Sequence, residues 1–284
     1  MGIYAMTGGA TGIGAAIKNT LRDAGHQVIV VDIKNADIEA DLSTEEGRNA
    51  AVDGIRAAAP DGLDGFIPVA GVGPHVSPPS LVARINYFGT VRVTQALVDD
   101  VAKRKGAIVM ISSNSAQIQA YNQDFLDACW ADDEAKAVEI VDALDGQEAY
   151  GGSKYGITVW MRKMSTELAG RGVRINAVAP GYTETPLTQN DALGDFKEAI
   201  DAFRDSIPIG RAGLPQDMAN AVEFLLSEKS SFVVGSCLYV DGGHDAIFRA
   251  ISESADITDD PVVVNPEADS KRADAGSVNV PLRR

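Results

Sequence analysis

The chain has 284 residues, 45% of them hydrophobic and 23% charged, an ordinary composition for a soluble globular protein with one large α/β domain or two small ones. Its formal net charge of -15 disfavours nucleic acid and anionic membrane surfaces as partners. The two cysteines form no metal-type cluster and no disulfide framework, and the sequence has neither a transmembrane run nor a signal-peptide pattern, so we expect a cytoplasmic protein.

Apolar runs alternate with helical patterns along the chain. The runs predict strands at residues 3–7, 27–32, 63–70, 107–112, 173–178 and 236–240. The patterns between them predict helices at residues 12–25, 43–59, 81–103, 149–170 and 215–227. Ser43, with Glu46 three residues later, indicates a capping box at the start of one helix. This alternation with short loops is typical of the α/β class, as a single doubly wound parallel sheet of the Rossmann type.

Two segments interrupt the alternation. Residues 115–149 contain nine acidic residues and one basic residue, Lys136, and their apolar residues recur at helical spacing. They predict a helical insertion of one or two amphipathic helices with an acidic outer face. Residues 252–284 are rich in Asp, Ser, Ala and Pro, which predicts a disordered tail. We therefore expect one folded domain at residues 1–251, with the insertion inside it.

A glycine-rich turn follows the first predicted strand, in the run Thr7-Gly8-Gly9-Ala10-Thr11-Gly12-Ile13-Gly14. Such glycines let the backbone approach a pyrophosphate, and the next helix then directs its N-terminus at the phosphates; the alternative is a glycine-rich turn without a ligand. Asp32 can accept from both ribose hydroxyls and repels a 2'-phosphate, which favours NAD over NADP. Lys34 is a counter-signal, which we interpret as a solvated turn residue. Asp41 and Leu42 are placed to meet the adenine, although Asp41 also suits the start of a helix.

Tyr150 and Lys154 stand about one turn apart on the same face of a predicted helix. A neighbouring cation favours the phenolate and lowers the pKa of a tyrosine, which can then exchange a proton with an alcohol oxygen near neutral pH. A solvated helix pair is the alternative for so short a motif. Tyr155 is the rival tyrosine, but position 159 is valine, so Tyr155 has no lysine partner.

Together these residues resemble the short-chain dehydrogenase/reductase family over roughly residues 2–250. The motifs that carry the resemblance occur in the family's order, namely the glycine-rich run, Asn86-Tyr87-Phe88-Gly89, Ser112-Ser113, Tyr150 with Lys154, Pro180-Gly181-Tyr182-Thr183-Glu184-Thr185-Pro186 and Val240-Asp241-Gly242-Gly243. Within the family the chain is similar to the bacterial NAD-dependent 3α-hydroxysteroid dehydrogenase/carbonyl reductases, which also have a helical insertion at this place. The resemblance implies a Rossmann-type NAD-binding oxidoreductase domain that interconverts a secondary alcohol and a ketone. One motif departs from the family: Pro68-Val69-Ala70-Gly71 stands where Asn-Asn-Ala-Gly is common, which puts one supporting hydrogen bond in doubt.

The resemblance also implies roles for single residues. Tyr150 carries over as the catalytic acid/base, and Lys154 as the residue that lowers its pKa and binds the nicotinamide ribose. Ser113 donates to the substrate oxygen and Asn86 holds a water near the lysine; the alternatives are a strand-end cap for Ser113 and a helix-surface position for Asn86. The predicted cofactor-binding residues are Gly8, Thr11, Gly12, Ile13, Gly14, Asp32, Ile33, Asp41, Leu42, Ala70, Gly71, Tyr150, Lys154 and Thr185. No metal site is expected, because the histidines are scattered and each suits a surface or loop position: His26, His75 and His244.

The expected substrate is bulky and apolar, a hydroxysteroid or another alicyclic or aromatic alcohol or ketone. The segment from Tyr182 through Leu187 to about Phe203 is predicted to form a lid beside the nicotinamide. Trp130 and Phe125 from the insertion are candidates for the cleft wall, but packing inside the insertion is the favoured interpretation. An NAD-binding regulator or scaffold without turnover is the alternative class, against which the presence of all four catalytic residues argues.

A homodimer is the expected assembly. Family members often pair through the helices near Asn86 and Tyr150, and two copies of the acidic insertion would repel each other there. The sequence therefore predicts an interface built on the helix at 215–227 and the last strand, near Val240.

Overall fold

The computed structural model describes residues 1–118, 121–191 and 197–249. Within these residues, seven parallel strands form one sheet in the order β3-β2-β1-β4-β5-β6-β7. The strands are β1 (Ile3–Thr7), β2 (Gln27–Asp32), β3 (Ile38–Glu39), β4 (Gly65–Pro68), β5 (Ala107–Ile111), β6 (Arg174–Pro180) and β7 (Cys237–Val240). The order reverses beside β1, and doubly wound sheets bind ligands at such a switch point.

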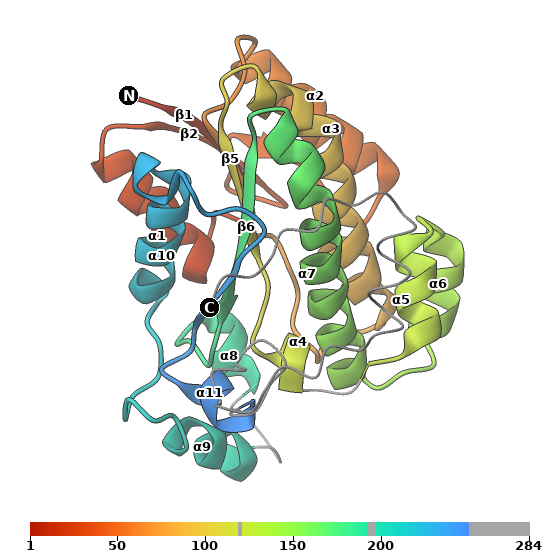
Figure 1. The fold of residues 1–284 in the computed structure, drawn as a ribbon. Coiled ribbons are helices and arrows are strands. Elements are labelled where there is room, and N and C mark those ends of the chain that lie inside the picture. The colour runs from red at the N-terminus through yellow and green to blue at the C-terminus, as the bar shows by residue number, and fades with distance from the viewer. Residues whose placement is uncertain (119–120, 192–196, 250–284) are drawn as a thin grey trace, which may run out of the picture. The chain divides into compact units, whose positions relative to one another are not determined.

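Helices cover both faces of the sheet (Figure 1). α1 (Gly12–Asp23) and α10 (Pro215–Leu226) pack on one face, and α2 (Glu45–Ala58), α3 (Thr90–Ala102) and α7 (Gly146–Gly170) pack on the other. β5 is buried along its whole length, as expected for a strand covered on both faces. The predicted fold class is thereby confirmed. The other helices in the described residues are η1 (Val82–Gly89), α4 (Ser115–Ile118), α5 (Gln123–Trp130), α6 (Glu134–Val141), α8 (Pro186–Asp191), α9 (Lys197–Asp205), η2 (Glu228–Ser230) and α11 (His244–Phe248).

The start of α2 differs from the prediction. Its N-cap is Thr44, whose hydroxyl accepts from the amide of Gly47 at 3.0 Å, so the predicted box of Ser43 and Glu46 is wrong. The amide of Ser43 donates instead to the carboxylate of Asp41 at 2.9 Å. This turn delays the helix, because Thr44 keeps an extended backbone.

The helix predicted at residues 81–103 is two elements in the structure. It begins as the π-helical segment η1 and continues as α3. Apolar periodicity does not reveal one extra residue in a turn, so the sequence predicts a continuous helix. π-helical turns are frequent at functional sites, and this one contains Asn86.

The predicted insertion consists mainly of α5 and α6, which pack against each other beside α7 and η1 (Figure 1). Phe125, Leu126 and Cys129 are buried inside it, in agreement with the amphipathic pattern. No helix of the described residues is long and apolar enough to span a membrane.

By contacts the chain divides into a unit of residues 1–245 and a unit of residues 246–284. Only residues 246–249 of the second unit are described. The tail at 252–284 lies outside the described residues, and its disorder stays a prediction.

Candidate active site

A pocket of about 360 Å³ lies where the sequence motifs meet, at the C-terminal ends of the central strands. It contains the ends of β2, β5 and β6 and the start of α1 in its wall. Every residue predicted to bind the cofactor lines it, namely Gly8, Thr11, Gly12, Ile13, Gly14, Asp32, Ile33, Asp41, Leu42, Ala70, Gly71, Tyr150, Lys154 and Thr185. Ser113 lines it as well, so the structure brings the glycine-rich run and the predicted catalytic cluster into one cavity.

The glycine-rich run forms a tight turn between β1 and α1. The amide of Gly8 donates to the carbonyl of Val31 at 2.8 Å, and Gly14 packs so closely that a Cβ there would lie 1.7 Å from the carbonyl oxygen of Gly8. Thr11, the N-cap of α1, makes no side-chain capping hydrogen bond. The amides of the first turn therefore face the pocket without a side-chain cap, and such a helix end binds anions. The turn thus fits the pyrophosphate of a dinucleotide.

Asp32 is fixed at the end of β2 by two backbone amides. One carboxylate oxygen accepts from Ala10 at 2.9 Å and the other accepts from Ile33 at 2.8 Å. Each oxygen keeps a further lone pair for a ligand hydroxyl. The structure thus places an oriented negative charge in the pocket wall next to the glycine-rich turn.

The position of Asp41 is compatible with both interpretations of its place in the sequence. It lines the pocket together with Leu42, and its carboxylate also accepts from the amide of Ser43 in the turn before α2. These two residues follow β3, the short strand at the edge of the sheet.

Lys154 is buried on α7, where its ammonium donates to the carbonyl of Ile111 at 2.9 Å. Its Nζ lies 5.8 Å from the ring centroid of Tyr150, on the same helix. Burial lowers the pKa of Lys154 to about 8, because a charged ammonium is poorly solvated there. The lysine is therefore mostly protonated at neutral pH and stands beside the phenol that it is predicted to tune.

Tyr155 lies outside the residues that line this pocket. Its ring stacks on Tyr121 of the insertion with centroids 4.4 Å apart. Burial, followed by the contact with Tyr121, raises the pKa of Tyr155, which is the wrong direction for a base near neutral pH. The structure favours Tyr150 over its rival.

The two adjacent serines at the end of β5 have different surroundings. The hydroxyl of Ser112 lies 2.7 Å from that of Thr158 and donates to the carbonyl of Lys154 at 3.3 Å, which ties β5 to α7. The hydroxyl of Ser113 accepts from the amide of Ser115 at 3.2 Å and keeps its proton for another acceptor. The bracing role of Thr158 was not predicted, because no local pattern marks a buried threonine.

Asn86 is fully buried, not on a helix surface. Its carboxamide oxygen accepts from the amide of Val72 at 2.8 Å, and its nitrogen donates to the carbonyl of Val72 at 3.0 Å. Gly71 lies between this carboxamide and the lysine, because a Cβ there would be 3.2 Å from Asn86 Oδ1 and 3.7 Å from Lys154 Nζ. The side chain thus braces the pocket wall, and the water-holding role of Asn86 stays a prediction.

The Pro68-Val69-Ala70-Gly71 segment is linked to the end of β1 by a side-chain hydrogen bond. The amide of Ala70 donates to the hydroxyl of Thr7 at 3.2 Å. Thr185 is also buried beside the pocket, at the start of α8, where its amide donates to the hydroxyl of Thr188 at 3.0 Å.

The segment predicted as a lid and the aromatic residues considered for the cleft wall agree only in part with the structure. Leu187 lines the pocket, but α8 and α9 occupy much of the segment predicted as a loop, and residues 192–196 lie outside the described residues. Phe125 is fully buried, and the indole of Trp130 donates to the carbonyl of Gly156 at 3.3 Å. Neither lines the pocket, so these aromatic residues belong to the packing of the insertion.

His244 corrects the expectation that all histidines lie at the surface or in loops. It is fully buried at the start of α11, with its Nε2 2.8 Å from the hydroxyl of Ser206 and its ring against Phe203. In the described part of the chain, no group of three or more His, Cys, Asp or Glu side chains is placed to hold a metal ion.

Comparison with known proteins identifies the family. A model described as short chain dehydrogenase matches residues 3–124, and one described as Enoyl-(Acyl carrier protein) reductase matches residues 136–245. The 3-alpha-hydroxysteroid dehydrogenase/carbonyl reductase of Comamonas testosteroni is 40% identical over 88% of this chain and 98% of its own. The chain belongs to the short-chain dehydrogenase/reductase family.

Two further similar proteins bear on the site. The crystal structure of the 3-alpha-hydroxysteroid dehydrogenase of Pseudomonas sp. B-0831, complexed with NADH, has a TM-score of 0.84 and 40% identity, over 88% of this chain and 99% of that one. Cis-4-hydroxycyclohexanecarboxylate dehydrogenase of Sinomonas cyclohexanicum is 30% identical over 86% of this chain and 97% of its own.

Proposed function

We propose that this short-chain dehydrogenase/reductase is an NAD(H)-dependent oxidoreductase that interconverts a secondary alcohol and a ketone. The observation that carries the proposal is the single pocket that joins the uncapped end of α1 and Asp32 to Ser113, Tyr150 and Lys154. The end of α1 and Asp32 fit a dinucleotide, whereas Ser113, Tyr150 and Lys154 fit proton transfer to a carbonyl oxygen. The 40% identical relative with NADH bound supports this choice of cofactor.

The proposed mechanism assigns a separate task to each side chain. NAD(H), when bound, supplies the hydride chemistry. Tyr150 gives its phenolic proton to the substrate oxygen during reduction and takes it back during oxidation. Lys154 stabilises the phenolate by its charge, and Ser113 donates a hydrogen bond that holds the substrate oxygen near Tyr150.

The substrate proposed for this site is a hydroxysteroid or the matching ketosteroid. The pocket wall near Thr185 includes Pro186 and Leu187, which suit an apolar ring system, and the Comamonas relative is named for a 3α-hydroxysteroid. A non-steroid alicyclic alcohol is the second candidate, favoured by the likeness to the cyclohexanecarboxylate enzyme.

The fluorescence of bound NADH tests this proposal against a regulator without turnover. We expect NADH to bind and to be consumed when ketones are added, with 3-ketosteroids converted faster than substituted cyclohexanones and aromatic ketones. Stable NADH fluorescence in the presence of every ketone would favour the regulator. A faster reaction with cyclohexanones would move the substrate to the second candidate.

We further propose a cytoplasmic homodimer that associates through α10 and β7. Phe224 on α10 and Leu238 on β7 are 41% and 39% exposed, and Phe232 between them in sequence is fully exposed. Large exposed apolar patches mark protein interfaces, and α10 and β7, which carry Phe224 and Leu238, are in contact. The opposite helical face, formed by η1 and α7, is covered by the protein's own insertion. Two cysteines in 284 residues are too few for a disulfide framework, which fits a reducing compartment.

A further inference from the structure

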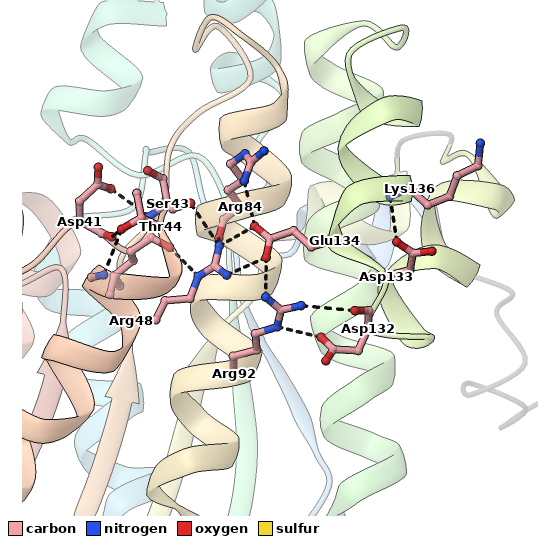
Figure 2. A network of polar contacts seen from close by, with 12 residues as sticks. Asp41, Ser43, Thr44, Arg48, Arg84, Arg92, Asp132, Asp133, Glu134 and Lys136 are labelled. Atoms are coloured by element: carbon pink, nitrogen blue, oxygen red, sulfur yellow. Dashed lines mark hydrogen bonds and ion pairs between the residues drawn. The ribbon is translucent and has the colours of Figure 1, made fainter.

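One carboxylate of the insertion, that of Glu134 at the first residue of α6, contacts three elements of the sheet domain (Figure 2). It accepts two hydrogen bonds from Arg48 of α2, at 2.7 and 2.8 Å. It accepts another from Arg84 of η1 at 3.2 Å and forms an ion pair with Arg92 of α3. The Glu134 side chain is only 17% exposed, so one carboxylate joins three arginines from three elements in a largely enclosed site.

Arg48 is the most buried of these arginines, at 4% exposure. Its Nε donates to the carbonyl of Leu42 at 2.8 Å, and its Nη2 donates to the carbonyls of Ser43 and Arg84 at 3.3 and 3.2 Å. The guanidinium therefore stands between the loop before α2 and the insertion. A buried guanidinium needs an anionic partner, and Glu134 is the carboxylate that binds it with both oxygens.

The loop before α2, to which Arg48 donates hydrogen bonds, is part of the pocket wall. Asp41 and Leu42 line the pocket on the side of Asp32, where the adenosine half of a dinucleotide is expected. They follow β3, a two-residue strand that pairs with β2 at the edge of the sheet. The hydrogen bond from Arg48 to the carbonyl of Leu42 holds this loop from the side of the insertion.

We infer that Glu134 and Arg48 are positioning residues for the cofactor, and that the insertion thereby sets the affinity for the adenosine half of NAD(H). The inference rests on the proposed function. Without the charge of Glu134, Arg48, Arg84 and Arg92 would face one another with no shared carboxylate. Arg48 would then turn toward solvent and release the carbonyl of Leu42, and the adenine-facing wall would lose its fixed shape.

Asp132 offers a matched control within the same network. It pairs with Arg92 at 2.9 Å, and its side chain is 65% exposed at the outer end of the cluster (Figure 2). Its backbone has a φ of +58°, a conformation that asparagine tolerates. Asp132→Asn therefore removes one negative charge from the same arginine cluster without touching Arg48.

The test compares halves of the cofactor in calorimetric titrations of the full chain. Glu134→Gln should weaken the binding of NADH and of ADP-ribose by about tenfold each, which corresponds to about 1.4 kcal/mol. The same variant should leave the affinity for reduced nicotinamide mononucleotide unchanged, and kcat at saturating NADH within about twofold of wild type. Asp132→Asn should change none of these values.

Arg48→Lys keeps the positive charge and the long aliphatic stem but loses the two-pronged contact with Glu134. It should therefore weaken ADP-ribose binding as Glu134→Gln does. If Glu134→Gln fails to fold, Arg48→Lys tests the inference in its place. Unchanged ADP-ribose affinity in a folded variant would overturn the inference. Equal weakening of ADP-ribose and reduced nicotinamide mononucleotide would also overturn it, because that result indicates a general structural role. Failure of the wild-type chain to bind NADH would instead overturn the proposed function.

Discussion

At the scale of single residues, Tyr150 and Lys154 carry the proposed chemistry. We expect Tyr150→Phe to lower kcat by about 10²–10⁴-fold while NADH still binds, because the ring stays and only the proton carrier is lost. Initial-rate kinetics with a ketone, together with NADH titration, measure both quantities. Tyr155→Phe is the control on the same helix and should remain active. Retained activity of Tyr150→Phe with loss in Tyr155→Phe would show that the proton carrier is the other tyrosine.

Asp32 makes the second prediction at this scale. Its fixed carboxylate should favour NAD(H) over NADP(H) by at least about tenfold in kcat/KM, because one unfavourable charge contact costs about 1.4 kcal/mol. Asp32→Ala should reduce that preference, mainly by improving the use of NADP(H). Equal kcat/KM for the two cofactors in the wild type would contradict this role.

At the scale of elements, the link between α6 and the sheet domain should depend on pH. Burial alone would raise the pKa of Glu134, but Arg48, Arg92 and Arg84 outweigh it and hold that pKa below the ordinary value of 4.5. A carboxyl group with a depressed pKa stabilises the folded state above its unfolded pKa, and this contribution disappears as the pH falls through the folded pKa.

We therefore expect Glu134→Gln to lower the free energy of unfolding by about 1–2 kcal/mol at pH 7, less than for a fully enclosed ion pair because the cluster has one exposed edge. The difference from wild type should shrink below pH 4.5. Urea unfolding of both proteins at several pH values measures it. A difference that stays constant down to acidic pH would show that the carboxylate's charge is not responsible.

Most elements could be predicted from the sequence, because both faces of the parallel sheet are buried and its strands are continuous apolar runs. The predicted ends of β1 and β2 agree with the structure, and the others differ by a few residues. The lining of the candidate pocket was predictable for another reason, since the glycine-rich run and Asp32 lie in one short strand-turn-helix-strand unit, β1-α1-β2. The motif thus places them next to one another.

The contacts of Glu134 could not be predicted in this way. Its partners come from three other elements, and Arg48 lies 86 residues away in the sequence. The sequence suggested an acidic outer face for the insertion, but this carboxylate points inward to the arginines. The hydrogen bond from the ammonium of Lys154 to the carbonyl of Ile111 could not be predicted either, because any residue type supplies a backbone carbonyl.

At the scale of the whole molecule, the insertion bears on assembly. The sequence predicted that charge repulsion keeps two copies from pairing through the helices near Asn86 and Tyr150. The structure adds a steric argument for the same prediction, since α5 and α6 of the same chain lie against α7 and η1. The exposed apolar residues near β7 remain for the proposed dimer.

Leu238→Glu should convert the proposed dimer to a monomer, because it introduces a charge into an apolar interface. Sedimentation velocity measures the change in mass. Glu139→Gln alters the exposed face of α6, where Glu139 is paired with Lys136, and should leave the dimer intact. A wild-type tetramer, or a dimer unaffected by Leu238→Glu, would contradict an interface at β7.

Isotope transfer tests the central claim most directly. The wild-type chain is incubated with a 3-ketosteroid and NADH that carries deuterium at the transferable position of the nicotinamide, and the product is analysed by mass spectrometry. The account predicts an alcohol with one deuterium on its carbinol carbon, formed by the wild type and nearly absent with Tyr150→Phe. An alcohol without deuterium, or bound NADH that transfers no deuterium to any ketone in the panel, would contradict it.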